Sequence, residues 1–377
     1  MSQLEPMVAA AVEWAGESRA LALTGLLVGI VFGFLAQRSR FCLRSAVIEF
    51  ARNFTGGKLT VWLFAFSTAI LATQALVLAG CFDAAGARQI TARGSLSGAA
   101  IGGALFGIGM VLARGCSSRL LVLAAQGNLR SLISGLVFAV AAQATWTGML
   151  APLRELISGW WTVEGGQSRD LVALTGLGHG GAFLFGAVWL GAAVIWARRQ
   201  QVQTWAWAGA IGVGLTIAAA WWATYLVTQV SFETHPVQSL SFTGPSAEVL
   251  SRVLFASDKE PTFDLGLVPG VFIGAFLAAA CFGELKLEGF QGGPGMRRYI
   301  IGALCMGFGG MLAGGCAVGA GLSGTAIFTI TAYVTLTAMW IAAAITDRLF
   351  DQHPAGRLDH GILPHLSGTD AALESLQ

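Results

Sequence analysis

The chain alternates between long apolar stretches and short polar connections over its 377 residues. A bilayer core needs about 20 apolar residues per helix. Only 11% of the residues are charged and 55% are hydrophobic, too little charge to cover the surface of a soluble domain of this length. The sequence therefore predicts an all-α polytopic membrane protein with about nine transmembrane helices, near residues 20–37, 59–80, 96–113, 131–150, 173–196, 205–229, 266–282, 299–313 and 328–349.

The charged connections predict the orientation of the chain. Basic residues follow the first, third, fifth and seventh spans, whereas the longest connection, 230–265, follows the sixth span and is acid-rich. The positive-inside rule then places the N-terminus outside and the C-terminus in the cytoplasm, as expected for a multi-pass protein of the cytoplasmic (inner) membrane. The net charge of +2 and the lack of a basic run argue against nucleic acid as a partner. Residues 1–19 lack a basic n-region, so we do not expect a cleaved signal peptide.

A repeat links two parts of the chain. A shift of 200 residues pairs 101–116 with 301–316 and gives eight identities in sixteen positions, including Gly102/Gly302, Gly109/Gly309 and Cys116/Cys316. The predicted third and eighth spans run in opposite directions, which is typical of an inverted-topology transporter. We therefore divide the chain into an N-terminal segment (1–19), a first repeat half (20–150), intervening helices with an extracytoplasmic loop (151–265), a second repeat half (266–350) and a cytoplasmic tail (351–377).

A weaker similarity links residues 25–34 with 267–276 through Gly29/Gly270 and Gly33/Gly274. These two spans run in the same direction in the predicted topology, so they do not fit a simple inversion. Glycines four residues apart allow helices to approach closely. We interpret this pair as helix packing.

Three segments are too short and too polar to cross the membrane: 39–50, 117–128 and 317–328. Each has room for a re-entrant half-helix that begins beside a cysteine. The free N–H groups and the positive dipole end of such a half-helix form an anion site. Gly115, Gly315, Gly319, Gly321 and Gly324 are expected to supply the close approach and positive φ that these turns need. The alternative is that the glycines only allow tight helix packing.

Cysteines fall into two groups. Cys42, Cys116 and Cys316 lie at the predicted breaks, whereas Cys81, Cys281 and Cys305 lie in or beside ordinary apolar spans, where they are expected to act as small hydrophobic residues. The chain has no C-x-x-C or H-x-x-H pair, so no zinc site is expected. A Cu(I) site formed by three converging thiols stays open.

Charged groups near the thiols have two interpretations. Arg44, Arg114 and Arg119 lie close to the cysteines in sequence and are candidates for attracting an anion, but they also fit the role of positive-inside anchors. His179 is interpreted as a satisfied packing residue rather than a proton-coupling group. Few other ionisable residues lie within the spans, which argues against a proton pump.

The three cysteine segments resemble the signature segments of the YeeE/YedE sulphur-transport family, which includes thiosulfate importers. They read GIVFGFLAQRSRFCLR (29–44), GIGMVLARGCSSR (107–119) and GFGGMLAGGCAVGAGLSG (307–324). The resemblance covers most of the membrane region. It implies that Cys42, Cys116 and Cys316 contact a sulphur anion. Some members of the family are associated with selenium instead.

These observations predict an importer of thiosulfate or a related inorganic sulphur anion, relayed along protonated thiols and half-helix N-termini. The substrate-binding set is Cys42, Cys116, Cys316, Gly115, Gly315 and Gly319. We expect no cofactor and no ATP use, since the chain has no Walker loop. Membrane lipid is the expected surrounding, and a cytoplasmic sulphur-carrier protein is a candidate partner. The alternatives are a membrane thiol-redox or persulfide-handling enzyme and a permease for soft metals or selenium compounds.

Overall fold

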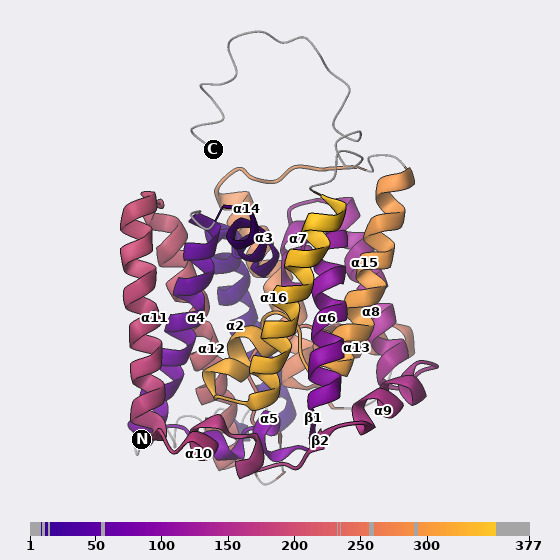
Figure 1. Ribbon diagram of the computed structural model, residues 1–377. Coiled ribbons are helices and arrows are strands. Elements are labelled where there is room, and N and C mark those ends of the chain that lie inside the picture. Colours follow the sequence, from indigo (N-terminus) through magenta and orange to yellow (C-terminus); the bar gives the residue numbers. More distant parts are fainter. Residues whose placement is uncertain are drawn as a thin grey trace.

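The computed structural model describes residues 9, 12–13, 16–53, 57–231, 233, 235–255, 260–289 and 293–351. Most of the predicted N-terminal segment (1–19) and of the predicted tail (351–377) lies outside these residues. The molecule is a bundle of roughly parallel and antiparallel helices, with most of the short elements towards its two ends (Figure 1). The predicted all-α fold is confirmed, since the strands are two residues long each.

Among the described residues, nine helices are long. They are α2 (Glu17–Ser39), α4 (Gly57–Leu78), α6 (Leu96–Leu112), α8 (Leu129–Trp146), α11 (Gly178–Gln200), α12 (Thr204–Val230), α14 (Phe263–Cys281), α15 (Gly293–Leu312) and α16 (Ile330–Phe350). Within the described ranges, eight helical stretches are long and apolar enough to cross a membrane. The predicted span 299–313 falls in α15, which is not among the eight and carries Arg297 and Arg298 near its start.

The short elements connect these helices or continue them. They are α3 (Leu43–Asn53), η1 (Ala84–Gly86), α5 (Arg88–Thr91), β1 (Gly94–Ser95), α7 (Ser117–Ala125), α9 (Ala151–Gly159), β2 (Thr162–Val163), η2 (Gln167–Arg169), α10 (Leu171–Thr175), α13 (Thr243–Phe255) and the π-helix η3 (Gly319–Gly324). In Figure 1, α3 and α7 lie towards the upper end, and α5, α9, α10 and the two strands lie at the lower end.

Helices α2 and α14 pack against each other along a seam of glycines. A β-carbon at Gly25, Gly29 or Gly33 would overlap a carbonyl oxygen of α14, and one at Gly266, Gly270 or Gly274 would overlap a carbonyl oxygen of α2. The paired residue numbers rise together along both helices, so the helices run parallel. The interpretation of the 25–34 and 267–276 similarity as helix packing is confirmed.

Helices α6 and α15 form a second glycine seam, with antiparallel direction. A β-carbon at Gly102 would lie 2.5 Å from the Gly309 oxygen, and one at Gly309 would lie 2.6 Å from the Gly102 oxygen. Gly109 and Gly302 meet in the same reciprocal way, at 2.5 and 2.7 Å. The 200-residue shift pairs Gly102 with Gly302 and Gly109 with Gly309. Across the seam these pairs are exchanged, because Gly102 meets Gly309 and Gly109 meets Gly302.

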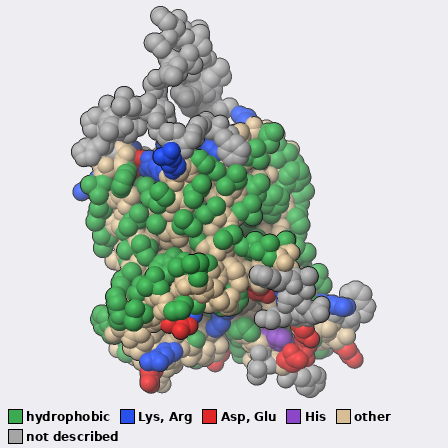
Figure 2. Space-filling model, turned by 90° about the vertical axis from the view of Figure 1, so that its right-hand side faces the viewer, with side chains coloured by type: hydrophobic (Ala, Val, Ile, Leu, Met, Phe, Trp, Pro, Cys, Tyr) green, Lys and Arg blue, Asp and Glu red, His purple; other side chains and the backbone are tan. Residues whose placement is uncertain are grey.

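Charged side chains gather at the two ends of the molecule, and hydrophobic ones cover its middle (Figure 2). At the end that carries α3, ion pairs join this helix to the end of α16. Arg52 contacts the fully buried Asp347 through two 2.6 Å hydrogen bonds, and Arg44 lies 3.6 Å from Asp351. These pairs fix the position of the helix that follows Cys42.

The connection 230–265 differs from the expected extracytoplasmic loop. Its residues 235–242, here called the strap, enter the interior, where Gln238, Ser239, Leu240 and Phe242 are buried. The strap is tied to α12: the Thr224 hydroxyl donates to the Gln238 oxygen at 2.7 Å, and the Ser239 hydroxyl donates to the Ile217 oxygen at 2.8 Å. Helix α13 follows it at mid-height in the bundle (Figure 1). The acidic side chains on either side of the strap pointed to a loop, whereas the consecutive buried residues 237–240 include polar side chains and gave no apolar pattern.

Candidate functional site

The three break cysteines follow the same backbone turn. Arg40, Arg114 and Gly314 each adopt a left-handed conformation, with φ of 52°, 56° and 74°, two residues before Cys42, Cys116 and Cys316. The N–H after each of them donates back to a carbonyl of the preceding helix: Phe41 to Ala36 (3.2 Å), Gly115 to Met110 (3.0 Å) and Gly315 to Gly310 (2.9 Å). This is the Schellman pattern of helix ends. The predicted helix breaks are confirmed at all three cysteines.

Each cysteine also begins the next helical segment. The Cys42 carbonyl accepts from the Ala46 N–H at 3.2 Å, the Cys116 carbonyl from Leu120 at 2.9 Å, and the Cys316 carbonyl from Ala320 at 2.8 Å. The N–H groups of the first turn therefore lie beside each thiol, and one of them, from Gly319, donates to the Cys316 sulphur. A helix start of this kind attracts anions. The chain contains this unit of turn, thiol and helix start three times.

The glycine expectation was partly wrong. Positive φ falls on Gly314, not on Gly115, Gly315 or Gly319. Gly315 and Gly319 are instead required by close approach, because their β-carbons would lie 2.9 Å from the Ala320 nitrogen and 2.5 Å from the Ser241 hydroxyl oxygen. A β-carbon at Gly115 has ordinary room. Arg114 and Gly314 differ in sequence, yet they occupy the same position of the turn.

Arg114 is an exposed arginine in a conformation that suits glycine. The left-handed region costs L-residues about 1–2 kcal/mol, so glycine at this position would relieve strain in the folded state. Part of that gain is lost because glycine also makes the unfolded chain more flexible. We expect Arg114→Gly to raise the free energy of unfolding by up to about 1 kcal/mol, measured by thermal unfolding in detergent. Arg114→Ala keeps the strained backbone and should give no gain. An equal gain from both variants would assign the effect to the lost charge.

Cys42 and Cys116 lie side by side. Their thiols are close enough to interact directly, and the Cys116 sulphur lies 3.4 Å from the Ser118 hydroxyl oxygen. Cys42 also lines a cavity of about 510 Å³ at the α3 end of the molecule, here called the cysteine cavity. Its basic lining residues are Arg38, Arg40, Lys58 and Arg119.

Cys316 lies in a different environment, between η3 and the strap. Its sulphur accepts the N–H of Phe242 at 3.3 Å and the N–H of Gly319 at 3.4 Å. The Ser323 hydroxyl of η3 donates to the Leu240 oxygen at 2.7 Å, which fixes the strap against the π-helix. π-helices are rare and occur frequently at functional sites. The two N–H donors leave the thiol proton of Cys316 free to donate elsewhere.

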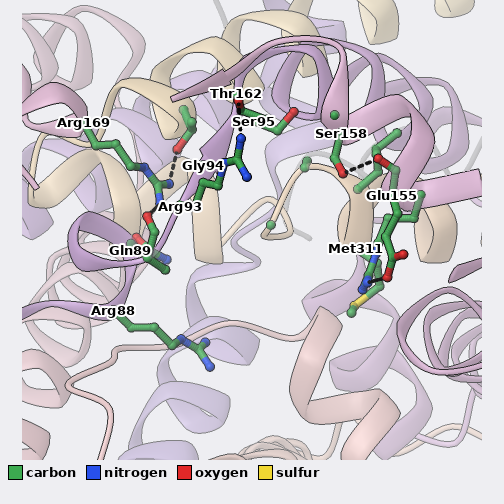
Figure 3. Close-up of a pocket in the computed structure, with 17 residues that line it drawn as sticks. Arg88, Gln89, Arg93, Gly94, Ser95, Glu155, Ser158, Thr162, Arg169 and Met311 are labelled. Atoms are coloured by element: carbon green, nitrogen blue, oxygen red, sulfur yellow. Dashed lines mark hydrogen bonds and ion pairs between the residues drawn. The ribbon is translucent and has the colours of Figure 1, made fainter. Parts of the chain in front are cut away.

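A second cavity, of about 550 Å³, opens at the lower end of the molecule and is here called the arginine vestibule (Figure 3). Arg154 lies 3.2 Å from Glu155, and the Arg93 guanidinium donates to the Thr162 hydroxyl at 3.0 Å. The Arg88 side chain extends along one side of the cavity (Figure 3). The lining of the arginine vestibule carries four arginines and one acidic residue: Arg88, Arg93, Arg154, Arg169 and Glu155. Such a lining favours anions.

Arg169 is the most buried of these arginines, at 7% exposure. Burial lowers the pKa of its guanidinium to about 10, so it still carries its charge at neutral pH. It donates to the Ala92 oxygen and, at 2.7 Å, to the Thr331 hydroxyl. Its Nε is buried and has no hydrogen-bond partner within the described part of the chain. Arg169 therefore holds the wall of the vestibule to the start of α16, while its buried Nε has no acceptor among the described residues.

Gln89 connects the arginine vestibule to Cys316. Its amide nitrogen donates to the Gly319 oxygen at 3.2 Å, and the Gly319 N–H in turn contacts the Cys316 sulphur. Gln89 also lines the vestibule (Figure 3). Gln89 thus links the lining of the vestibule directly to the segment that carries the Cys316 thiol.

A family model for sulphur transport matches residues 38–345. The chain belongs to the sulphur transport family. Two curated relatives are both named thiosulfate transporter TsuA. The one from Escherichia coli K12 is 27% identical over 335 residues, which cover 84% of this chain and 91% of the relative. The one from Spirochaeta thermophila is 29% identical over 336 residues, 82% and 93% of the two chains. Both relatives are named as transporters, which agrees with the expectation of a transporter rather than an enzyme.

The remaining predicted residues of this sulphur transport family member have different surroundings. Arg44 is paired with Asp351, whereas Arg119 lines the cysteine cavity and keeps a buried Nη1 without a hydrogen-bond partner among the described residues. His179 Nδ1 lies 3.0 Å from the Gln74 amide oxygen, a contact that agrees with its interpretation as a satisfied packing residue. The three thiols do not gather into one metal-binding group; within the described ranges only Glu17, Glu233 and His235 approach such a group.

Sequence reasoning missed the arginine vestibule. Arg88, Arg93 and Gln89 lie in one short connection and Arg154 and Arg169 in another, about 60 residues later. Neither connection carries a motif, and each reads as an ordinary polar loop. A signal was nevertheless present. The predicted topology places both connections on the outer side, which the positive-inside rule expects to be poor in basic residues, yet they carry four arginines.

Proposed function

We propose that this sulphur transport family member imports thiosulfate from the arginine vestibule to the cysteine cavity, past the thiols of Cys316, Cys116 and Cys42. The observation that carries the proposal is the unit of turn, thiol and helix start, present three times, with a basic cavity at each end of the molecule. The names of the two relatives support thiosulfate as the substrate.

The chemistry of the site suits a small sulphur anion. Thiosulfate presents sulphonate-like oxygens and a terminal sulphur. Backbone N–H groups at helix starts suit the oxygens, and a soft S–H donor suits the sulphur. The thiols act in their neutral form, because a thiolate would repel a dianion. Weak S–H hydrogen bonds let the site release its anion, which transport requires.

The unpartnered donors support an anion path at both ends. The Arg169 Nε in the vestibule and the Arg119 Nη1 beside Cys42 are buried donors without a hydrogen-bond partner within the described ranges. A buried donor without a partner is costly. A passing anion supplies the missing acceptor.

The reciprocal seam of α6 and α15 supports an inverted repeat in this proposal, with Cys116 and Cys316 as equivalent positions. The excess of basic residues at the end that carries the cysteine cavity supports a cytoplasmic position for that end in the inner membrane. The anion then enters from outside through the vestibule. A cytoplasmic sulphur-carrier protein would collect it beside Arg38, Arg40 and Lys58.

The test is uptake of labelled thiosulfate into vesicles that contain the purified transporter and no other protein. We expect uptake that saturates, that excess unlabelled thiosulfate blocks and that an equal concentration of sulfate leaves nearly unchanged. Uptake without any carrier protein would show that a carrier is not needed for passage. Preference for a selenium anion, or a stable gain of one sulphur atom in the mass of the protein without uptake, would contradict the proposal.

A further inference from the structure

Helix α9 follows a tight reversal after the membrane helix α8. A β-carbon at Gly148 would lie 2.8 Å from the Ala144 Cα, so the turn requires glycine at this position. Pro152 lies in the first turn of α9, where its missing N–H costs nothing. The far end is fixed to α6: the Ser97 hydroxyl donates to the Ile157 oxygen at 2.7 Å, and the Leu96 N–H donates to the Trp161 oxygen at 2.8 Å. The helix is thus held at the rim of the arginine vestibule.

The two faces of α9 differ in chemistry. Arg154, Glu155, Ser158 and Gly159 line the vestibule. Leu153, Leu156 and Trp160 recur at helical spacing on the other face. The side chains on that face and just beyond it are exposed: Leu153 45%, Leu156 61%, Trp160 65% and Trp161 64%. One face therefore belongs to the vestibule, and the other presents large apolar groups outward.

The outward face of α9 continues a surface that faces lipid. Helix α8 is one of the apolar helices that can cross the membrane, and Leu132, Leu136 and Val140 form an exposed stripe along it. Trp146 and Met149, 40% and 87% exposed, extend this stripe to the start of α9. Figure 2 views this side of the molecule, where hydrophobic side chains reach down to the charged lower rim.

We propose that α9, with Trp160 and Trp161, lies in the bilayer interface at the vestibule end and packs its apolar face among lipid acyl chains. Amphipathic helices with large apolar side chains on one face bind at the boundary of head groups and acyl chains, and tryptophan prefers this depth. The unbroken stripe from α8 identifies the occupant as lipid. The vestibule wall formed by α9 then has the cavity on one side and lipid on the other.

The test compares Trp160→Phe/Trp161→Phe with the parent protein in vesicles. Two of the twelve tryptophans are removed, and phenylalanine keeps the face apolar. We expect lipids with brominated acyl chains to quench less of the fluorescence in the variant, with a loss of about one-sixth or more of the parent's quenched signal, because few other tryptophans are as exposed. Quenching by aqueous iodide should change little.

Two outcomes would overturn this proposal. If the removed signal is the part that iodide quenches, the face lies in water. If neither quencher reports the loss, protein covers the face, as in contact with a second copy of the chain. Thiosulfate uptake by the variant is a separate measurement, so failure of this proposal and failure of the transport function are distinguishable.

Discussion

Thiosulfate uptake is expected to fall at least about tenfold when Cys316 is replaced by serine, which corresponds to a loss of about 1.4 kcal/mol. The serine hydroxyl still accepts the N–H groups of Phe242 and Gly319, so η3 and the strap keep their hydrogen bonds. It replaces a soft, weak donor by a hard one that does not suit the terminal sulphur of the anion. Uptake into vesicles measures the effect.

Cys316→Ala is the less informative variant. It leaves the two N–H groups buried without an acceptor, at about 1–3 kcal/mol each, so lost uptake could reflect lost structure. The matched controls are Cys281→Ser and Cys305→Ser, since these thiols lie outside the proposed path and are exposed or half-buried. Both should transport as the parent does. Full uptake by the folded Cys316→Ser protein would remove this thiol from the mechanism.

The largest effect on apparent affinity is expected from the arginine vestibule. Replacing Arg88 and Arg93 together by glutamine removes two positive charges from its lining. Each charge contributes about 1 kcal/mol to a charged ligand near 4 Å in water. The half-saturating thiosulfate concentration should therefore rise at least about tenfold, with a smaller change in the maximal rate. Uptake measured over a range of thiosulfate concentrations separates the two quantities.

The control for this pair is Arg198→Gln/Arg199→Gln at the end of α11, which removes the same charge outside the vestibule lining. This variant should keep the half-saturating concentration. Added salt should weaken uptake by the parent and change that of the Arg88/Arg93 variant less, because screening acts on charges that are present. An unchanged half-saturating concentration in the Arg88/Arg93 variant would contradict a role of the vestibule in capture.

Much of the fold could be predicted from the sequence because hydrophobic length and Gly-Cys spacing are local signals. The breaks at Cys42, Cys116 and Cys316 were found, as was the packing of Gly29 and Gly33. The left-handed position was assigned to the wrong glycines, because Arg40 and Arg114 occupy it without being glycine. Backbone conformation at such a turn depends on the hydrogen bonds around it as well as on residue type.

Only part of the site could be predicted from the sequence. A thiol beside a helix start can be recognised within ten residues, but the strap meets Cys316 from a segment more than 70 residues away. The arginines of the vestibule come from two loops and converge only in the folded protein. Contacts between distant segments leave no local pattern, so neither the Phe242 N–H nor Arg169 could be assigned from the sequence.

The two glycine seams have a consequence for how the transporter moves. Each seam joins a helix of the first half, α2 or α6, to a helix of the second half, α14 or α15, with backbone against backbone. Such interfaces leave few flexible side chains that could rearrange, so we expect the helices of each seam, α2 with α14 and α6 with α15, to move as one unit. In the proposed transport, we then expect the displacements that let an anion pass to fall on smaller elements, such as the strap and η3, rather than on these helix pairs.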